Sequence, residues 1–151
     1  MKRKTILLVD DDADDRSLFC EAWQLAAPEI ICSTARNGRH ALSMLEKKEI
    51  ELPAIIFLDV NMPIINGWQL LALLKKDLSY KMIPVVMYST SSSQEDINKA
   101  HQLGAFCFFT KPHDFRVLEK CLEAVAENLH NDSLSNLTNI PEFFVAPHEE
   151  A

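Results

Sequence analysis

Short apolar runs alternate five times with longer amphipathic stretches along the chain. The short runs are rich in β-branched and aromatic residues, which is typical of buried strands. We predict strands over residues 5–9, 30–35, 54–58, 83–88 and 106–109. The stretches between them place apolar residues three or four positions apart, which predicts helices with one buried face. The clearest such stripe is Leu118, Cys121, Leu122, Val125 and Leu129.

The alternation of strand and helix predicts an α/β fold. Parallel strands need a crossover connection, and a helix is the usual one. The predicted strands are apolar throughout, which indicates a sheet covered by helices on both faces. We therefore expect a doubly wound sheet of five parallel strands. In such sheets, ligands bind beyond the carboxyl ends of the strands.

The length and charge narrow the class of protein further. The 151 residues fit one domain, and 22 acidic against 15 basic residues give a formal charge of −7. Nucleic acid is not an expected partner, because binding it requires an excess of Lys and Arg. No apolar run approaches the roughly 20 residues of a membrane span, and the run after the basic residues 2–4 is too short for a signal peptide. We expect a cytoplasmic protein without a membrane partner.

Glycine, cysteine and histidine indicate no additional cofactor site. The three glycines cannot form a dinucleotide-binding or Walker A loop. The five histidines lack the short spacings of metal ligands and are expected at the surface. The four cysteines stand singly in apolar stretches, which predicts reduced and mostly buried thiols at Cys20, Cys32, Cys107 and Cys121.

Polar side chains follow four of the five predicted strands. Asp10 and Asp11 follow the first, Asp59 the third, Ser89 the fourth and Lys111 the fifth. Carboxylates about 4 Å apart repel by roughly 4 kcal/mol at an effective dielectric constant near 20, so such a cluster must bind a cation or protons. Oxygen ligands with retained water favour Mg²⁺. The Ser89 hydroxyl and the Lys111 ammonium could then contact a phosphoryl group.

Each of these residues also has an ordinary structural explanation. Asp12, Asp14 and Asp15 are expected to cap and begin the first helix, where negative charge is favourable. Asp59 alone could begin a turn, and Ser89 and Lys111 could be surface residues. Four such groups at the ends of four strands favour one common site.

The motifs at these strand ends resemble those of receiver domains, the phosphoacceptor modules of two-component response regulators. The resemblance covers residues 4–129. It is carried by Leu7-Leu8-Val9-Asp10-Asp11, by Asp59-Val60-Asn61-Met62-Pro63 followed by Gly67, by the strand end at residues 84–89 and by Thr110-Lys111-Pro112. It implies a flavodoxin-like strand order, 2-1-3-4-5.

The resemblance implies a role for each acidic residue of the cluster. In the family, the aspartate of the D-x-x-M-P segment accepts a phosphoryl group from a histidine kinase, which would make Asp59 the acceptor. Mg²⁺ would then be held by Asp59, by Asp11 directly, by Asp10 through water and by Asn61 through its backbone carbonyl.

The resemblance also implies a switch. The switch hydroxyl would be Ser89, beside the charge of Lys111, and the switch aromatic residue would be Phe108, which lacks the hydroxyl of a tyrosine. The implied function is a phosphorylation-dependent signalling protein, not an enzyme. Its partners would be a histidine kinase or a histidine phosphotransfer protein and an unknown protein target, which reads the surface of the fourth helix and the fifth strand.

The sequence leaves two alternatives open. Asp10-Asp11-Asp12 also fits the Asp-x-Asp of haloacid-dehalogenase-type phosphatases, with Asp10 as the nucleophile. Against it, Asp14 stands where that family has threonine or valine, and the chain is short for a core plus a cap. The second alternative is a receiver-like interaction module that is never phosphorylated.

The last residues, 130–151, are expected to form a tail outside the receiver-like domain. The helical stripe stops near Asn131, and polar residues then surround a small apolar patch at Phe143, Phe144 and Val145. Chain ends are often loose, so we expect a loose or lightly packed extension. The alternative is that the apolar patch docks on the domain or on a partner.

Overall fold

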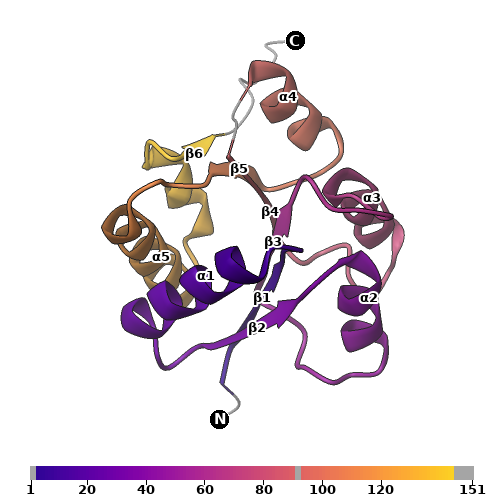
Figure 1. Ribbon diagram of the computed structural model, residues 1–151, viewed down its shortest axis with the longest axis horizontal. Coiled ribbons are helices and arrows are strands. Elements are labelled where there is room, and N and C mark those ends of the chain that lie inside the picture. The colour runs from indigo at the N-terminus through magenta and orange to yellow at the C-terminus, as the bar shows by residue number, and fades with distance from the viewer. Residues whose placement is uncertain (1–2, 91–92, 145–151) are drawn as a thin grey trace.

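A six-stranded sheet forms the centre of the computed structural model, which describes residues 3–90 and 93–144 (Figure 1). The first five strands are parallel and lie in the predicted order 2-1-3-4-5, so the α/β, doubly wound fold is confirmed. A sixth strand pairs antiparallel with the fifth, which the prediction of five strands missed. The strands are β1 (Thr5–Val9), β2 (Ile31–Ala35), β3 (Ile55–Asp59), β4 (Val85–Ser89), β5 (Cys107–Thr110) and β6 (Phe143–Phe144).

Five α-helices in the described residues cover both faces of the sheet (Figure 1). They are α1 (Ala13–Ala26), α2 (Gly38–Glu46), α3 (Gly67–Lys76), α4 (Gln94–Gln102) and α5 (Phe115–His130). Helices α1 and α5 pack on one face, and the apolar residues of α2, α3 and α4 pack on the other. None of the described helices combines the length and apolar character that crossing a bilayer requires.

Two separate cores, one on each face of the sheet, explain why the strands are apolar throughout. Along β1, Ile6 and Leu8 face the core beneath α1 and α5, whereas Leu7 and Val9 face the core beneath the other helices. Successive side chains of a strand point to opposite faces, and here both faces are covered. Every residue of β1, β3 and β4 is buried as a result.

Side-chain caps start the helices that follow the strands. The Asp12 carboxylate accepts a hydrogen bond from the backbone N–H of Asp15 at 3.0 Å, which confirms the predicted cap of α1. Asn66 caps α3 and forms a reciprocal capping box with Gln69. Early helix starts keep the connections short, so residues that follow the strands stay at one edge of the sheet.

The predictions for cysteine and histidine hold in part. Cys107 and Cys121 are buried, but Cys20 and Cys32 are only half-buried. Three histidines are exposed and His40 is half-buried, whereas His148 lies outside the described residues. Cys20 and Cys32 are therefore accessible to solvent, whereas the sequence pattern predicted mostly buried thiols.

Residues 133–144, which fall in the predicted tail, pack against the domain in this structure. A 3₁₀-helix, η1 (Leu134–Asn139), buries Leu137 completely against α5 and the adjacent core. The Phe143 ring stacks on Phe109, with ring centroids 4.2 Å apart and planes 11° from parallel. Phe143 and Phe144 of the apolar patch thus pack on the two cores of the domain, while Val145 lies outside the described residues.

The tail packs because β5 would otherwise be an exposed edge strand. The backbone N–H of Thr110 donates to the carbonyl of Glu142 at 3.0 Å, and β6 continues this pairing along β5. Open edges leave backbone groups unpaired and invite pairing with other chains. The added strand therefore covers backbone groups of β5 and the Phe109 ring together.

The Phe143→Ala substitution should lower the free energy of unfolding by about 3 kcal/mol, because it removes a buried ring stacked on another ring. Urea unfolding followed by circular dichroism measures the change. Phe144→Ala, from the same strand, is the control and should cost less, because the side chain of Phe144 is only half-buried. Equal stability of Phe143→Ala and the wild type would mean that the segment does not pack on the domain in solution.

Candidate functional site

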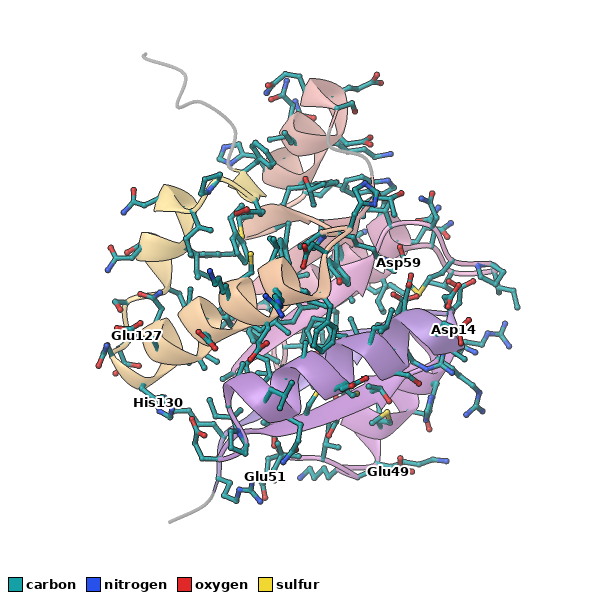
Figure 2. The ribbon with its side chains drawn as sticks, turned by 60° about the vertical axis from the view of Figure 1, so that its left-hand side comes forward. Asp14, Glu49, Glu51, Asp59, Glu127 and His130 are labelled. Atoms are coloured by element: carbon teal, nitrogen blue, oxygen red, sulfur yellow. The ribbon has the colours of Figure 1, made fainter. Side chains whose placement is uncertain are left out.

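The predicted polar residues meet at the carboxyl edge of the sheet. Four polar side chains are buried among the described residues, and three of them, Asp10, Asp59 and Ser89, lie at this edge. Figure 2 shows Asp59 and Asp14 at one end of the molecule, with Glu127 and His130 at the other. The strand register places Ser89 opposite Thr110, so Lys111 follows directly beside it. Strands 1, 3, 4 and 5 therefore supply one common site.

Three carboxylates form a compact acidic cluster. Each of Asp10, Asp11 and Asp59 offers an oxygen within 4.8 Å of the others. Asp10 is completely buried and Asp59 is 6% exposed, whereas Asp11 faces solvent. Backbone N–H groups hold two of these side chains: that of Asp12 donates to Asp10 at 2.9 Å, and that of Asn61 to Asp59 at 3.3 Å.

Lys111 supplies the positive charge of the cluster. Its Nζ lies 3.0 Å from Asp10 Oδ2, 3.0 Å from Asp15 Oδ2 and 3.7 Å from Asp59 Oδ1. It also lies 4.9 Å from the centroid of the Tyr88 ring, within the range of a cation–π contact. Lys111 is therefore anchored by three carboxylates and one aromatic face.

Burial and neighbouring charge act in opposite directions on the two central groups. Burial raises the pKa of Asp59 to about 7; the Lys111 ammonium opposes this rise and the Asp10 charge adds to it. Burial alone would lower the pKa of Lys111, but the carboxylates of Asp10 and Asp59 outweigh it and raise that pKa. Lys111 therefore stays charged at neutral pH, whereas the pKa of Asp59 lies close to neutral pH.

The donor set of this cluster fits a hard divalent cation. Three carboxylates and one ammonium leave an excess of negative charge, which a cation would neutralise. Within the part of the chain described here, no side-chain hydrogen bond or ion pair engages Asp11. Its exposed carboxylate therefore combines access from solvent with a free ligand atom, next to the buried Asp59.

The loop after β3 is held in place by Gly67. A Cβ atom at this position would lie 2.3 Å from the carbonyl oxygen of Asp59 and 2.9 Å from Cα of Val60. Only glycine permits this approach, and its N–H donates to the carbonyl of Val60 at 3.0 Å. The start of α3 thereby closes the loop that carries the exposed Asn61, two residues after Asp59.

The predicted switch residues lie on neighbouring strands but face different surroundings. Ser89 is buried at the end of β4, and its carbonyl accepts the backbone N–H of Lys111 at 2.7 Å. Phe108 is completely buried in the core shared with α2, α3 and α4. It pairs with Met87 on one side and with Phe144 of β6 on the other. Phe108 therefore connects the middle of the sheet to the added strand.

Two contacts of Lys111 were not predicted from the sequence. Asp15 was assigned only to the start of α1, yet it forms one of the two shortest ion pairs of Lys111. Tyr88, the last residue of the strand predicted over residues 83–88, supports Lys111 with its ring. Acidic residues are common in the first turn of a helix, so this feature alone does not predict a contact with Lys111. The one available signal was that the helix carrying Asp15 begins at the site.

The family model of the response regulator receiver domain matches residues 6–123. The chain is 31% identical over 126 residues to the response regulator Rcp1 of Synechocystis sp., covering 81% of this chain and 86% of Rcp1. It is also 32% identical over 144 residues to a protein-glutamate methylesterase/protein-glutamine glutaminase of Methanococcoides burtonii, covering 91% of this chain. That match spans only 39% of the methylesterase.

Solved structures resemble the chain over most of its length. The phosphorylated cyanobacterial phytochrome response regulator RcpA matches with a TM-score of 0.78 and 30% identity, covering 87% of this chain and 96% of RcpA. The Mn²⁺-bound form of Rcp1 matches with a TM-score of 0.72 and 29% identity, covering 82% of this chain and 92% of the Rcp1 chain.

Without divalent cations, Asp59→Asn should raise the free energy of unfolding at about pH 8 by on the order of 2 kcal/mol. The pKa of Asp59 is about 7 in the folded protein and roughly 3.9 in an unfolded chain. Between these values the folded state binds the proton more tightly, so the wild type loses stability as the pH rises through this window. Asparagine carries no charge, and the advantage of the variant should disappear toward about pH 4.

Urea unfolding in the presence of a chelator, at both pH values, measures this difference. Asp14→Asn is the control, because Asp14 is an exposed acid near the same end of the molecule. Its effect should be small at both pH values. An advantage of Asp59→Asn that does not change with pH would contradict the raised pKa of Asp59.

Proposed function

The chain belongs to the response regulator receiver family, and on that premise we propose that it is a phosphorylation-dependent signalling switch with Asp59 as the phosphoacceptor. One observation carries the proposal. Asp59 is a nearly buried carboxylate at a strand end, with a lysine ammonium 3.7 Å away and two further acids beside it. This arrangement offers both a nucleophile and the charges that a phosphoryl group needs.

Asp59 acts as the nucleophile in the proposed transfer. A carboxylate oxygen attacks the phosphorus of a phosphohistidine, the P–N bond breaks, and the imidazole leaves with the bonding electron pair. Negative charge spreads over the three equatorial oxygens of the phosphoryl group in the transition state, so catalysis depends on position and electrostatics. Asp59 must be ionised for this step, and its pKa of about 7 in the protein alone keeps it close to that state.

The surrounding residues bind and orient the phosphoryl group. We assign Asp10, Asp11, Asp59 and the Asn61 carbonyl to an Mg²⁺ site. The ion would neutralise the cluster and offer open positions to phosphoryl oxygens. The Mn²⁺-bound form of Rcp1 supports a divalent site in a protein of similar fold.

The phosphorylated state is stabilised by two groups. The Lys111 ammonium pairs with a phosphoryl oxygen, and the Ser89 hydroxyl donates a hydrogen bond to another. To reach the phosphoryl group, Lys111 must give up part of its contact with Asp15 and Tyr88.

A change at Lys111 and Ser89 reaches the surface through the aromatic core. The Tyr88 ring lies 5.2 Å from Phe109, which in turn stacks on Phe143 of β6. Phe108, the proposed switch residue, pairs with Phe144. We therefore assign partner recognition to the surface of α4 and β5, together with β6. A histidine kinase or phosphotransfer protein would supply the phosphoryl group, and an unknown protein would bind this surface.

The phosphatase alternative does not fit the environment of Asp10. Its side chain is completely buried, one oxygen accepts the N–H of Asp12 and the other contacts Lys111 at 3.0 Å. An oxygen committed in this way is a poor nucleophile. The proposal makes the chain a phosphoacceptor, and it assigns none of the methylesterase activity of the larger relative to these residues.

Acetyl phosphate and Mg²⁺ should add one phosphoryl group to the wild type and none to Asp59→Asn, because the variant lacks the nucleophile. Intact mass spectrometry measures the addition, and a chelator should abolish it. Asp14→Asn is the matched control and should be labelled like the wild type. Labelling of Asp59→Asn with loss in Asp10→Asn would favour the phosphatase, and no labelling of any protein would favour the module that is never phosphorylated.

Lys111→Ala should retain part of the phosphoryl incorporation but lose the response at β5 and β6, because no charge then couples the phosphoryl group to Tyr88. Amide hydrogen exchange with and without acetyl phosphate measures the response. Lys120→Ala, which changes an exposed lysine of α5, is the control. An unchanged response in phosphorylated Lys111→Ala would refute the role proposed for this lysine.

A further inference from the structure

Two cysteines that take no part in the site at Asp59 lie close together in the structure. Cys20 lies in the middle of α1 and Cys32 lies on β2, at the edge of the sheet. Their Sγ atoms are 3.9 Å apart, in van der Waals contact. Both side chains are half-buried, so a small solute can reach them.

The distance is short enough for a covalent bond after a small adjustment. A disulfide needs an S–S distance of about 2 Å, so the two sulfur atoms must approach by roughly the same amount. Rotation of the Cys20 side chain supplies part of this movement. Cys32 lies on β2, which among the described residues is an edge strand paired with β1, so it can supply the rest without breaking a central strand.

The surroundings of the two cysteines favour Cys20 as the thiolate that reacts first and Cys32 as the thiol that reacts second. The contact with Cys32 and the charge of Arg16, one helical turn before Cys20, lower the pKa of Cys20 to about 7. The thiolate is the reactive form of cysteine, so Cys20 is suited to be the nucleophile. The neighbouring Cys20 and burial raise the pKa of Cys32, which favours a thiol that reacts second.

The other two cysteines provide a contrast within the same chain. Cys107 and Cys121 are buried, and burial raises the pKa of each thiol to about 12. Buried thiols with little thiolate react slowly. Oxidation should therefore be confined to one pair.

We propose that Cys20 and Cys32 are a redox-modification site that forms an intramolecular disulfide on exposure to a hydroperoxide. The Cys20 thiolate attacks the terminal OH oxygen of the hydroperoxide and the O–O bond breaks. Hydroxide or alkoxide leaves, and Cys20 becomes a sulfenic acid. The Cys32 sulfur then attacks the Cys20 sulfur, the S–O bond breaks, and the Cys32 proton leaves with the hydroxyl group as water. Two thiols are oxidised and one hydroperoxide is reduced. The site is independent of the proposed function at Asp59.

The test uses the full chain, reduced and then treated with hydrogen peroxide. The protein should become lighter by two hydrogen atoms, and denaturing alkylation should then label two of its four cysteines. Trypsin releases both cysteines in one peptide, residues 17–36. A glutamyl endopeptidase cuts between them, after Glu21 and Glu29, so only a cross-link keeps the two fragments together.

Two variants complete the experiment. Cys32→Ser should gain oxygen at Cys20 instead of losing two hydrogen atoms, because no second thiol is in contact. The Cys107→Ser, Cys121→Ser double variant should lose two hydrogen atoms like the wild type. The proposal would be overturned if the wild-type fragments separate after peroxide treatment, or if oxidation links two chains. The wild-type peptide map decides the question even if a variant fails to fold.

Discussion

The ion pair between Lys111 and the buried Asp10 is the interaction on which the rest of the site depends. A completely buried carboxylate is stable only when it is paired and hydrogen-bonded, and Asp10 obtains both from Lys111 and from the N–H of Asp12. The same lysine lies 3.7 Å from Asp59. Because the Lys111 ammonium contacts three carboxylates, any anion that reaches Asp59 competes with them for this lysine. The pair therefore stabilises the site, and an anionic ligand would have to compete with it for the lysine.

The site keeps more negative charge than its lysine can neutralise. Burial, to which the Asp10 charge adds, raises the pKa of Asp59 to about 7, so an ionised Asp59 should make the protein alone less stable than one with an uncharged side chain at that position. The cost is consistent with a functional site, because a core selected only for stability would not gather these acids. A cation would relieve part of the repulsion, whereas a phosphoryl group would add negative charge that the cation and Lys111 would have to balance. Ligand binding and stability are thus linked through the same few carboxylates.

The C-terminal segment gives the domain a surface that its central fold alone does not have. Strand β6 closes the β5 edge, and its aromatic residues extend a chain of ring contacts that begins beneath Lys111. In packed cores, side chains shift between discrete arrangements instead of deforming continuously. A rearrangement at Tyr88 can therefore displace Phe109 and Phe143. This makes β6 part of the surface through which a change at the site would become visible to a partner.

The sequence by itself determined the five parallel strands and the residues gathered at their ends, and its resemblance to receiver domains implied the strand order. Apolar runs and helical stripes are local patterns, and parallel strands bring their carboxyl ends to one edge whatever the details of packing. Tertiary structure alone decided the docking of η1 and β6, the contact of Asp15 with Lys111 and the approach of Cys20 to Cys32. A two-residue strand has no periodicity, and an acid in a first helical turn or a lone cysteine has no local signal. Their roles follow from contacts between elements far apart in the chain, which only the packed structure brings together.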